Sequence, residues 1–307
     1  MVQPLFSPNK PTRIVEATPH LRVAARTDTG HVRSHNEDAY GVVAIGSDAL
    51  SKHQRSSERV VLGERGVLLT VSDGMGGAES GAVASAIVVE RMKTGLVQAL
   101  GNKPVAEAMR EAVMGAHRAV RHASAARQQP EAVRMGATLT AAYVCKGEAT
   151  IAQVGDSRAY LVRGGKITLL THDQTMVQAL VDGGVMNVEE VPTSPFRNLV
   201  LQAMGHEEEI EIAVSRLSLR DRDLLMLCSD GLTSVVSDRE IERTLSASLP
   251  VAVAIDRLID LTNVRGSPDN VTVVLAGVSG DFPPCDPTEP VASTVEVITP
   301  FVGKIRH

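Results

Sequence analysis

The sequence VLLTVSDGMGG occupies residues 67–77, and LLMLCSDGL occupies residues 224–232. Each begins as an apolar run typical of a buried strand and ends in Ser-Asp-Gly. A buried strand that ends in a carboxylate places an oxygen ligand at the edge of a sheet, and Mg²⁺ and Mn²⁺ prefer such ligands. An isolated Asp-Gly is turn chemistry, which is our interpretation of Asp182-Gly183. Two copies at strand ends favour a metal site.

Three other loops beside predicted strands also carry carboxylates. Glu37 and Asp38 directly precede one strand, Asp156 lies between two strands, and Asp269 leads into the last strand. Acidic loop residues are usually solvated surface, and Asp156 alone would suit a capped hairpin turn. Because five strand ends present carboxylates together, their repulsion would need cations to offset it.

The composition narrows the class of protein. The chain has 307 residues, 43% of them hydrophobic, no Trp, and a net charge of −5. The net negative charge argues against a dedicated nucleic-acid-binding protein, which usually has a basic excess. Three cysteines without a CxxC pair indicate a reducing compartment. No apolar run approaches the ~20 residues of a membrane span, so we expect a cytoplasmic protein with no membrane partner. We also expect a monomer.

The hydrophobic pattern favours one domain. We expect a flexible arm at residues 1–20, a domain at 21–278 and a tail at 279–307 with a short strand at 295–302. Residues 46–65 form a polar excursion between two strands. Strands cluster with strands and helices come in pairs, which favours an antiparallel α+β layered fold. The expected strands cover 21–27, 38–45, 67–73, 137–145, 148–155, 158–163, 166–170, 223–230 and 270–278, and the expected helices cover 82–100, 104–127 and 251–262.

The ordered set of motifs resembles the metal-dependent protein phosphatases of type 2C (the PPM family), in their bacterial form. The resemblance covers roughly residues 21–278. It implies a four-layer α/β/β/α sandwich of two antiparallel sheets flanked by helix pairs. The matching stretches are RSHNEDAY, VSDGMGG, GATLTAAYV, VGDSRAYLVR, HDQT, NLVLQAMG, LCSDGL and SPDNVTVVL.

The resemblance also implies site residues for two Mn²⁺ or Mg²⁺ ions. Asp73 would bridge both ions, with the Gly74 carbonyl on one of them. Asp230 and Asp269 would hold the other ion. Three more implied site residues lie just before the second expected strand. Glu37 would lie near an ion, Asp38 would orient bound water, and Arg33 would bind the substrate phosphate.

The activity implied is that of a protein serine/threonine phosphatase opposing a bacterial Ser/Thr kinase. A metal-bound hydroxide would attack the phosphorus of phosphoserine or phosphothreonine directly, with Asp73, Asp230 and Asp38 as catalytic residues. Two alternatives stay open. The same metal centre could hydrolyse a small phosphate ester, or the chain could be a regulatory pseudophosphatase without turnover.

Three departures from the family pattern matter. Met75 stands where eukaryotic members often have a histidine general acid, and His31, His35 and His172 are other candidates for that role. Ser234 replaces a common aspartate, so Asp156 would hold at most a weak third ion. Leu201 and Gln202 replace a Thr-Arg pair in the flap region, residues 172–205, to which substrate choice is often attributed.

Overall fold

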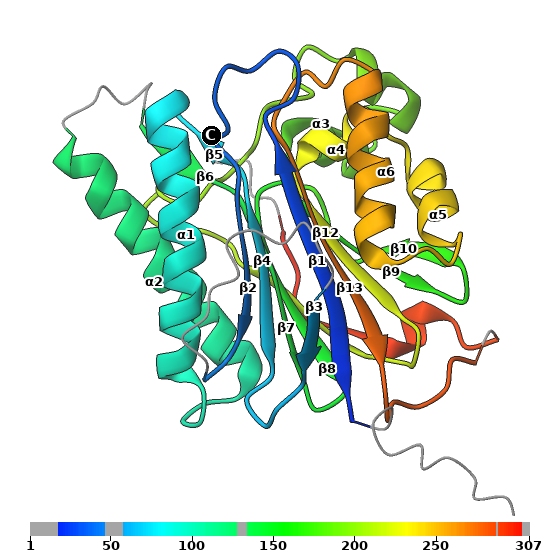
Figure 1. Cartoon of the computed structure of the whole chain (residues 1–307). Coiled ribbons are helices and arrows are strands. Elements are labelled where there is room, and N and C mark those ends of the chain that lie inside the picture. Colours follow the sequence, from blue (N-terminus) through cyan, green and yellow to red (C-terminus); the bar gives the residue numbers. More distant parts are fainter. Residues whose placement is uncertain (1–17, 47–57, 128–133, 287, 303–307) are drawn as a thin grey trace, which may run out of the picture.

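The computed structural model describes residues 18–46, 58–127, 134–286 and 288–302. Two six-stranded antiparallel sheets pack face to face, and helices cover the outer face of each sheet (Figure 1). This is the four-layer α+β sandwich expected from the sequence. None of the helices in these ranges has the length and apolar character needed to cross a membrane.

The first sheet has the strand order β10-β9-β12-β13-β1-β3. Its centre is β13, which is buried along nearly its whole length and pairs with β1 and β12. The strands are β1 (His20–Asp28), β3 (Glu58–Val61), β9 (Arg158–Arg163), β10 (Lys166–Leu169), β12 (Leu224–Cys228) and β13 (Val271–Ser279).

The second sheet has the order β14-β11-β8-β7-β4-β2. The strand β4 is buried at all six positions and pairs with β2 and β7, so its end is held firmly in the sheet. The strands are β2 (Ala39–Ala44), β4 (Val67–Ser72), β7 (Leu139–Cys145), β8 (Glu148–Val154), β11 (Ala213–Ser218) and β14 (Val295–Thr299). A separate two-stranded sheet pairs β5 (Gly74–Met75) with β6 (Gly136–Ala137).

Helices complete the outer layers. The pair α1 (Ala78–Ala99) and α2 (Val105–Ala126) covers the second sheet, and Pro104 occupies the N-cap position of α2. The first sheet is covered by α5 (Asp238–Leu245) and α6 (Val251–Val264), with the short α4 (Asp230–Thr233) beside them. Aliphatic side chains such as Leu69, Val71 and Val274 fill the space between the sheets.

Some elements differ from the expectation. The excursion at 46–65 contains β3, which adds an edge strand beside β1, and its residues 47–57 lie outside the described ranges. The short strand expected at 295–302 is present as β14, and it pairs with β11 at the edge of the second sheet. Residues 1–17 of the expected arm are not described, and His20 already belongs to β1. The region 172–212 forms α3 (Met176–Asp182) and a 3₁₀ helix, η2 (Val188–Thr193).

Candidate active site

The predicted carboxylates come from strand ends that meet at one end of the sandwich. Asp73 follows β4, and Asp230 follows β12 after one intervening serine. Asp38 immediately precedes β2, Asp269 lies just before β13, and Asp156 sits in the turn between β8 and β9. The two sheets therefore contribute carboxylates to the same region.

A pocket of about 240 Å³, called the acidic pocket below, opens at this end. Nearly all of the predicted site residues line it, and Met75 and Asn270 line it as well. The exception is Asp38, which is not among the lining residues. The predicted residues that line it are Arg33, Glu37, Asp73, Gly74, Asp156, Asp230 and Asp269.

Two carboxylate oxygens near the pocket are buried without a partner in the described part of the chain. These atoms are Oδ1 of Asp38 and Oδ1 of Asp230. The other oxygen of Asp38, Oδ2, accepts a 2.7 Å hydrogen bond from the Ser229 hydroxyl. A buried carboxylate oxygen without a donor is costly, and a bound cation would remove that cost. The residues present therefore fit a divalent metal.

The electrostatics of the cluster agree with this interpretation. Burial raises the pKa of Asp38 to about 7, and the charges of Asp230 and Asp269 act in the same direction. Burial and the charge of Asp230 raise the pKa of Asp156 to about 8. The pKa values of Asp73 and Asp230 are raised in the same way, by burial and by neighbouring carboxylates. Without cations, these groups would resist being ionised together.

Side chains alone do not complete such a site. Within the described ranges, no three His, Cys, Asp or Glu side chains form a group that could hold a metal ion. Mg²⁺ and Mn²⁺ also accept carbonyl and water oxygens, and the carbonyl-bearing Gly74 lies in the pocket wall. A Cβ on Gly74 would collide with the Gly81 carbonyl at the start of α1. A glycine is therefore required at position 74.

Arg33 supplies the positive charge at the pocket. Its Nη2 lies 2.8 Å from Oδ2 of Asp269, and this hydrogen bond raises the arginine pKa. Half of the Arg33 side chain is exposed, at 50%. Burial raises the pKa of Glu37, although the charge of Arg33 opposes that shift. Arg33 is thus anchored within the acidic cluster but open to a ligand.

Two residues that sequence analysis did not assign hold the site in shape. The Asn270 Oδ1 accepts from the Glu37 amide at 2.8 Å, and its Nδ2 donates to the His35 carbonyl at 2.9 Å. The Thr138 hydroxyl accepts from the Asp73 amide at 2.9 Å. Both residues lie in motifs noted above, SPDNVTVVL and GATLTAAYV. Their place in these motifs is the feature of the sequence that could have identified them as site residues.

The candidate histidines lie outside the acidic pocket. The His172 Nε2 is 2.6 Å from Asp182 Oδ2, and the His35 ring contacts the neighbouring serine hydroxyl. His31 is exposed, and its backbone amide bonds to the Ser267 carbonyl. None of the three is among the residues that line the pocket.

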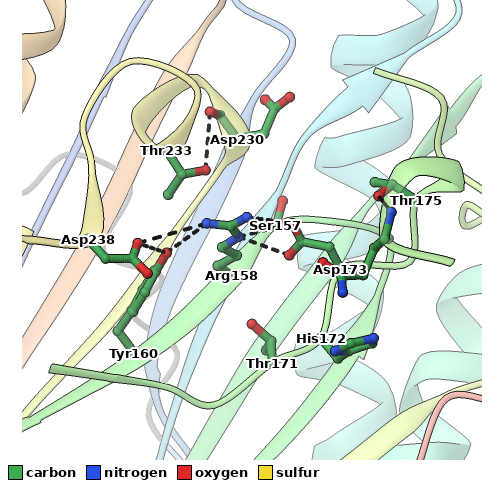
Figure 2. A network of polar contacts seen from close by, with 12 residues as sticks. Ser157, Arg158, Tyr160, Thr171, His172, Asp173, Thr175, Asp230, Thr233 and Asp238 are labelled. Atoms are coloured by element: carbon green, nitrogen blue, oxygen red, sulfur yellow. Dashed lines mark hydrogen bonds and ion pairs between the residues drawn. The ribbon is translucent and has the colours of Figure 1, made fainter. Parts of the chain in front are cut away.

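An arginine network adjoins the site on the β9 side. Figure 2 shows Arg158 between Asp173 and the pair Tyr160 and Asp238. The guanidinium donates to both carboxylate oxygens of Asp173, at distances down to 2.6 Å, and to the Tyr160 hydroxyl at 3.0 Å. That hydroxyl donates to Asp238 at 2.9 Å. The network fixes the start of the flap region to β9 and α5.

The family described as protein phosphatase 2C matches residues 48–254. The serine/threonine protein phosphatase PstP of Mycobacterium tuberculosis is 37% identical over 262 residues, which cover 84% of this chain and 45% of that protein. The serine/threonine phosphatase stp of Listeria welshimeri is 31% identical, covering 81% of this chain and 93% of that protein. This chain therefore spans less than half of the mycobacterial relative and nearly all of the Listeria one.

Solved structures show the same likeness. The catalytic domain of the serine/threonine protein phosphatase PstP, in complex with two manganese ions, is 35% identical with a TM-score of 0.69. The match covers 85% of this chain and all of that domain. The serine/threonine phosphatase Stp1 from Staphylococcus aureus has a TM-score of 0.70 at 32% identity, covering 85% of this chain and 96% of that one.

Proposed function

Because the chain belongs to the protein phosphatase 2C family, we propose that it hydrolyses phosphoserine and phosphothreonine in proteins with two divalent cations, Mn²⁺ or Mg²⁺. The observation that carries this proposal is the acidic pocket, whose wall combines five carboxylates with Arg33. A phosphate ester is repelled by such a wall unless cations neutralise it. The pocket therefore suits a metal-dependent hydrolase of phosphate esters.

The family's motif pattern, as matched in this chain, gives the division of ligands between the two cations. By that pattern Asp73 would hold both ions, the Gly74 carbonyl one, and Asp230 with Asp269 the other. Glu37 would complete the coordination, directly or through water, as would Asp38. The unpartnered oxygens of Asp38 and Asp230 support this assignment. When bound, the ions supply a water of lowered pKa and neutralise charge on the phosphoryl oxygens.

The chain's own residues would position the phosphoryl group. Arg33 can bind two phosphoryl oxygens at once because guanidinium is planar with several donors, and in the free protein Asp269 takes that place. Met75 has no ionisable group. We therefore propose that water, rather than a histidine, protonates the leaving serine or threonine oxygen. Asp156 would hold a third ion weakly, since Ser234 nearby offers only a neutral oxygen.

Relatives named serine/threonine phosphatases support a phosphorylated protein as the substrate. Such a substrate is the product of a serine/threonine kinase, so the chain would reverse that class of reaction. We propose that this kinase is bacterial, as are the organisms of both relatives.

The first experiment is phosphate release from a phosphothreonine peptide with Mn²⁺, with Mg²⁺ and with EDTA. We expect release only with metal. Asp230→Asn should lower it by more than about a hundredfold, the upper range for losing even an outer-shell partner of a metal ligand. Asp260→Asn is the matched control, because Asp260 is 67% exposed on α6 and does not line the acidic pocket.

Three results would contradict the proposal. Folded wild-type protein that releases no phosphate with either metal would exclude a protein phosphatase and favour a non-catalytic role. Release from a nucleotide but not from any phosphopeptide would move the substrate to a small phosphate ester. Equal activity in EDTA would exclude the metal mechanism itself.

A further inference from the structure

A second pocket, of about 280 Å³, lies directly beside the acidic pocket. Asp156, Asn198 and Asp230 line both pockets, so the two share a wall. A phosphorylated residue held in the acidic pocket would bring its neighbours in the peptide to this second pocket. Its other lining residues come from the start of β9, from α3 and the segment before it, from η2 and the segment that follows it, and from the end of α4.

Two arginines and three aspartates line the second pocket. Asp156 and Asp230 belong to the shared wall, whose charge the proposed cations would offset, so the charge left for an anionic ligand depends on the arginines. Arg158 lines the pocket, but its guanidinium is bound to both oxygens of Asp173. Arg197 also lines it and is exposed, and in the described part of the chain its guanidinium makes no hydrogen bond or ion pair. Arg197 is next in sequence to Asn198, which belongs to the wall shared with the acidic pocket.

The rest of the second pocket suits the stem of a side chain. Val177, Val191 and Pro192 line it, and they form an apolar surface next to Arg197. Thr233 and Ser234 add neutral hydroxyls on the α4 side. A side chain with a short aliphatic stem and an anionic end matches this combination, because the stem packs on the apolar surface and the anion meets the free guanidinium.

We propose that the second pocket receives a substrate side chain close to the phosphorylated residue, and that Arg197 selects an acidic one, either Glu, Asp or a second phosphorylated residue. This inference rests on the proposed phosphatase function and names the class of phosphoprotein it prefers. Arg33 then binds the phosphoryl group that is removed, and Arg197 binds a negative charge that stays on the substrate.

The test compares phosphothreonine peptides that carry Glu, Gln or Lys at the two positions on each side of the phosphothreonine. With Mn²⁺, wild type should prefer the Glu peptide over the Gln peptide in kcat/KM by about three- to fivefold, the upper part of the range for an exposed ion pair. The difference should lie in KM. Arg197→Ala should bring this ratio to about one, Arg197→Lys should keep part of it, and Arg197→Glu should favour the Lys peptide.

Arg257→Ala is the matched control, since Arg257 is an exposed arginine on α6 that lines neither pocket. It should keep the wild-type ratio. A wild-type ratio of about one, or an unchanged ratio in Arg197→Ala, would overturn the inference while leaving the phosphatase proposal intact. Release from none of the peptides would overturn both.

Discussion

The two ends of β12 carry aspartates in opposite circumstances. At its start, Asp223 is fully buried and pairs with Arg163, whose side chain is only 2% exposed. The Arg163 Nε and Nη2 donate to the two carboxylate oxygens at 2.9 and 2.7 Å, and the Arg220 amide donates at 2.8 Å. Every oxygen of Asp223 therefore has a donor, and its charge is balanced within the chain.

At the other end, Asp230 has no such compensation. Its Oδ1 is buried without a partner in the described structure, and burial together with Asp269 raises its pKa. Asp73 and Asp156 lie in the same pocket wall, so the local charge is strongly negative. The chain balances one buried carboxylate with its own arginine and leaves the other for a ligand. That difference distinguishes a structural charge from a functional one.

Asp223→Asn should have the largest effect on stability. The amide would place an NH₂ group or a single acceptor against a buried guanidinium, and breaking a buried pair from one side costs about 3–5 kcal/mol. Urea unfolding should show this loss in the free energy of unfolding. It should also weaken the attachment of the C-terminal segment to β9, because Arg163 Nη1 donates to the Thr294 hydroxyl.

Glu296→Gln is the control for that measurement. Glu296 pairs with Arg216 at 2.6 Å, but both side chains are exposed, at 61% and 44%. We expect a change below about 1 kcal/mol, as for most surface ion pairs. If Asp223→Asn lowers the free energy of unfolding no more than Glu296→Gln does, then the buried Arg163–Asp223 pair does not stabilise the fold.

The next largest effect should be the pH dependence of stability in EDTA. A carboxyl group whose folded pKa is raised binds more protons in the folded state than in the unfolded state, so stability falls as pH rises between the two pKa values. For Asp38 and Asp156 that window runs from about 4 to about 7 and about 8. One pKa unit corresponds to about 1.4 kcal/mol, and we expect a total loss of at least about 2 kcal/mol.

Saturating Mn²⁺ should reverse this slope, because metal ligands must be deprotonated and binding releases protons. Thermal unfolding at pH 5, 6, 7 and 8, with EDTA and with Mn²⁺, measures both slopes. If stability changes with pH in the same way in EDTA and in Mn²⁺, then no cation binds to the carboxylates. That result would contradict the proposed metal site.

The carboxylates of the site could be predicted from the sequence because each stands next to an apolar strand. Strand ends in two packed sheets meet at few places, so the sequence pattern alone predicts that Asp73 and Asp230 share one site. The supporting contacts of Asn270 and Thr138 could not be placed, since they depend on register between distant segments. The Arg163–Asp223 pair joins residues 60 positions apart and has no local signal.

The missed elements have a common physical cause. The strand β11 alternates weakly and carries an exposed arginine, and α5 is eight residues long with only Ile241 and Leu245 buried. Packing against neighbours, rather than hydrophobic periodicity, stabilises such short elements. The start of α5 did carry a signal, because Ser237 and Glu240 form a capping box.

The smallest predicted effect tests the comparison most directly, since it makes the same substitution at the other end of β12. In EDTA at pH 8, Asp230→Asn should raise the free energy of unfolding by about 1 kcal/mol, because it removes one charge from a group of mutually repelling carboxylates. In Mn²⁺ the order should reverse, because wild type binds the metal more tightly and gains more stability from it. Urea unfolding under both conditions decides the sign. If Asp230→Asn and Asp223→Asn both destabilise the metal-free protein, then the two ends of the strand carry charges of the same kind, and the acidic pocket does not depend on a cation for its balance.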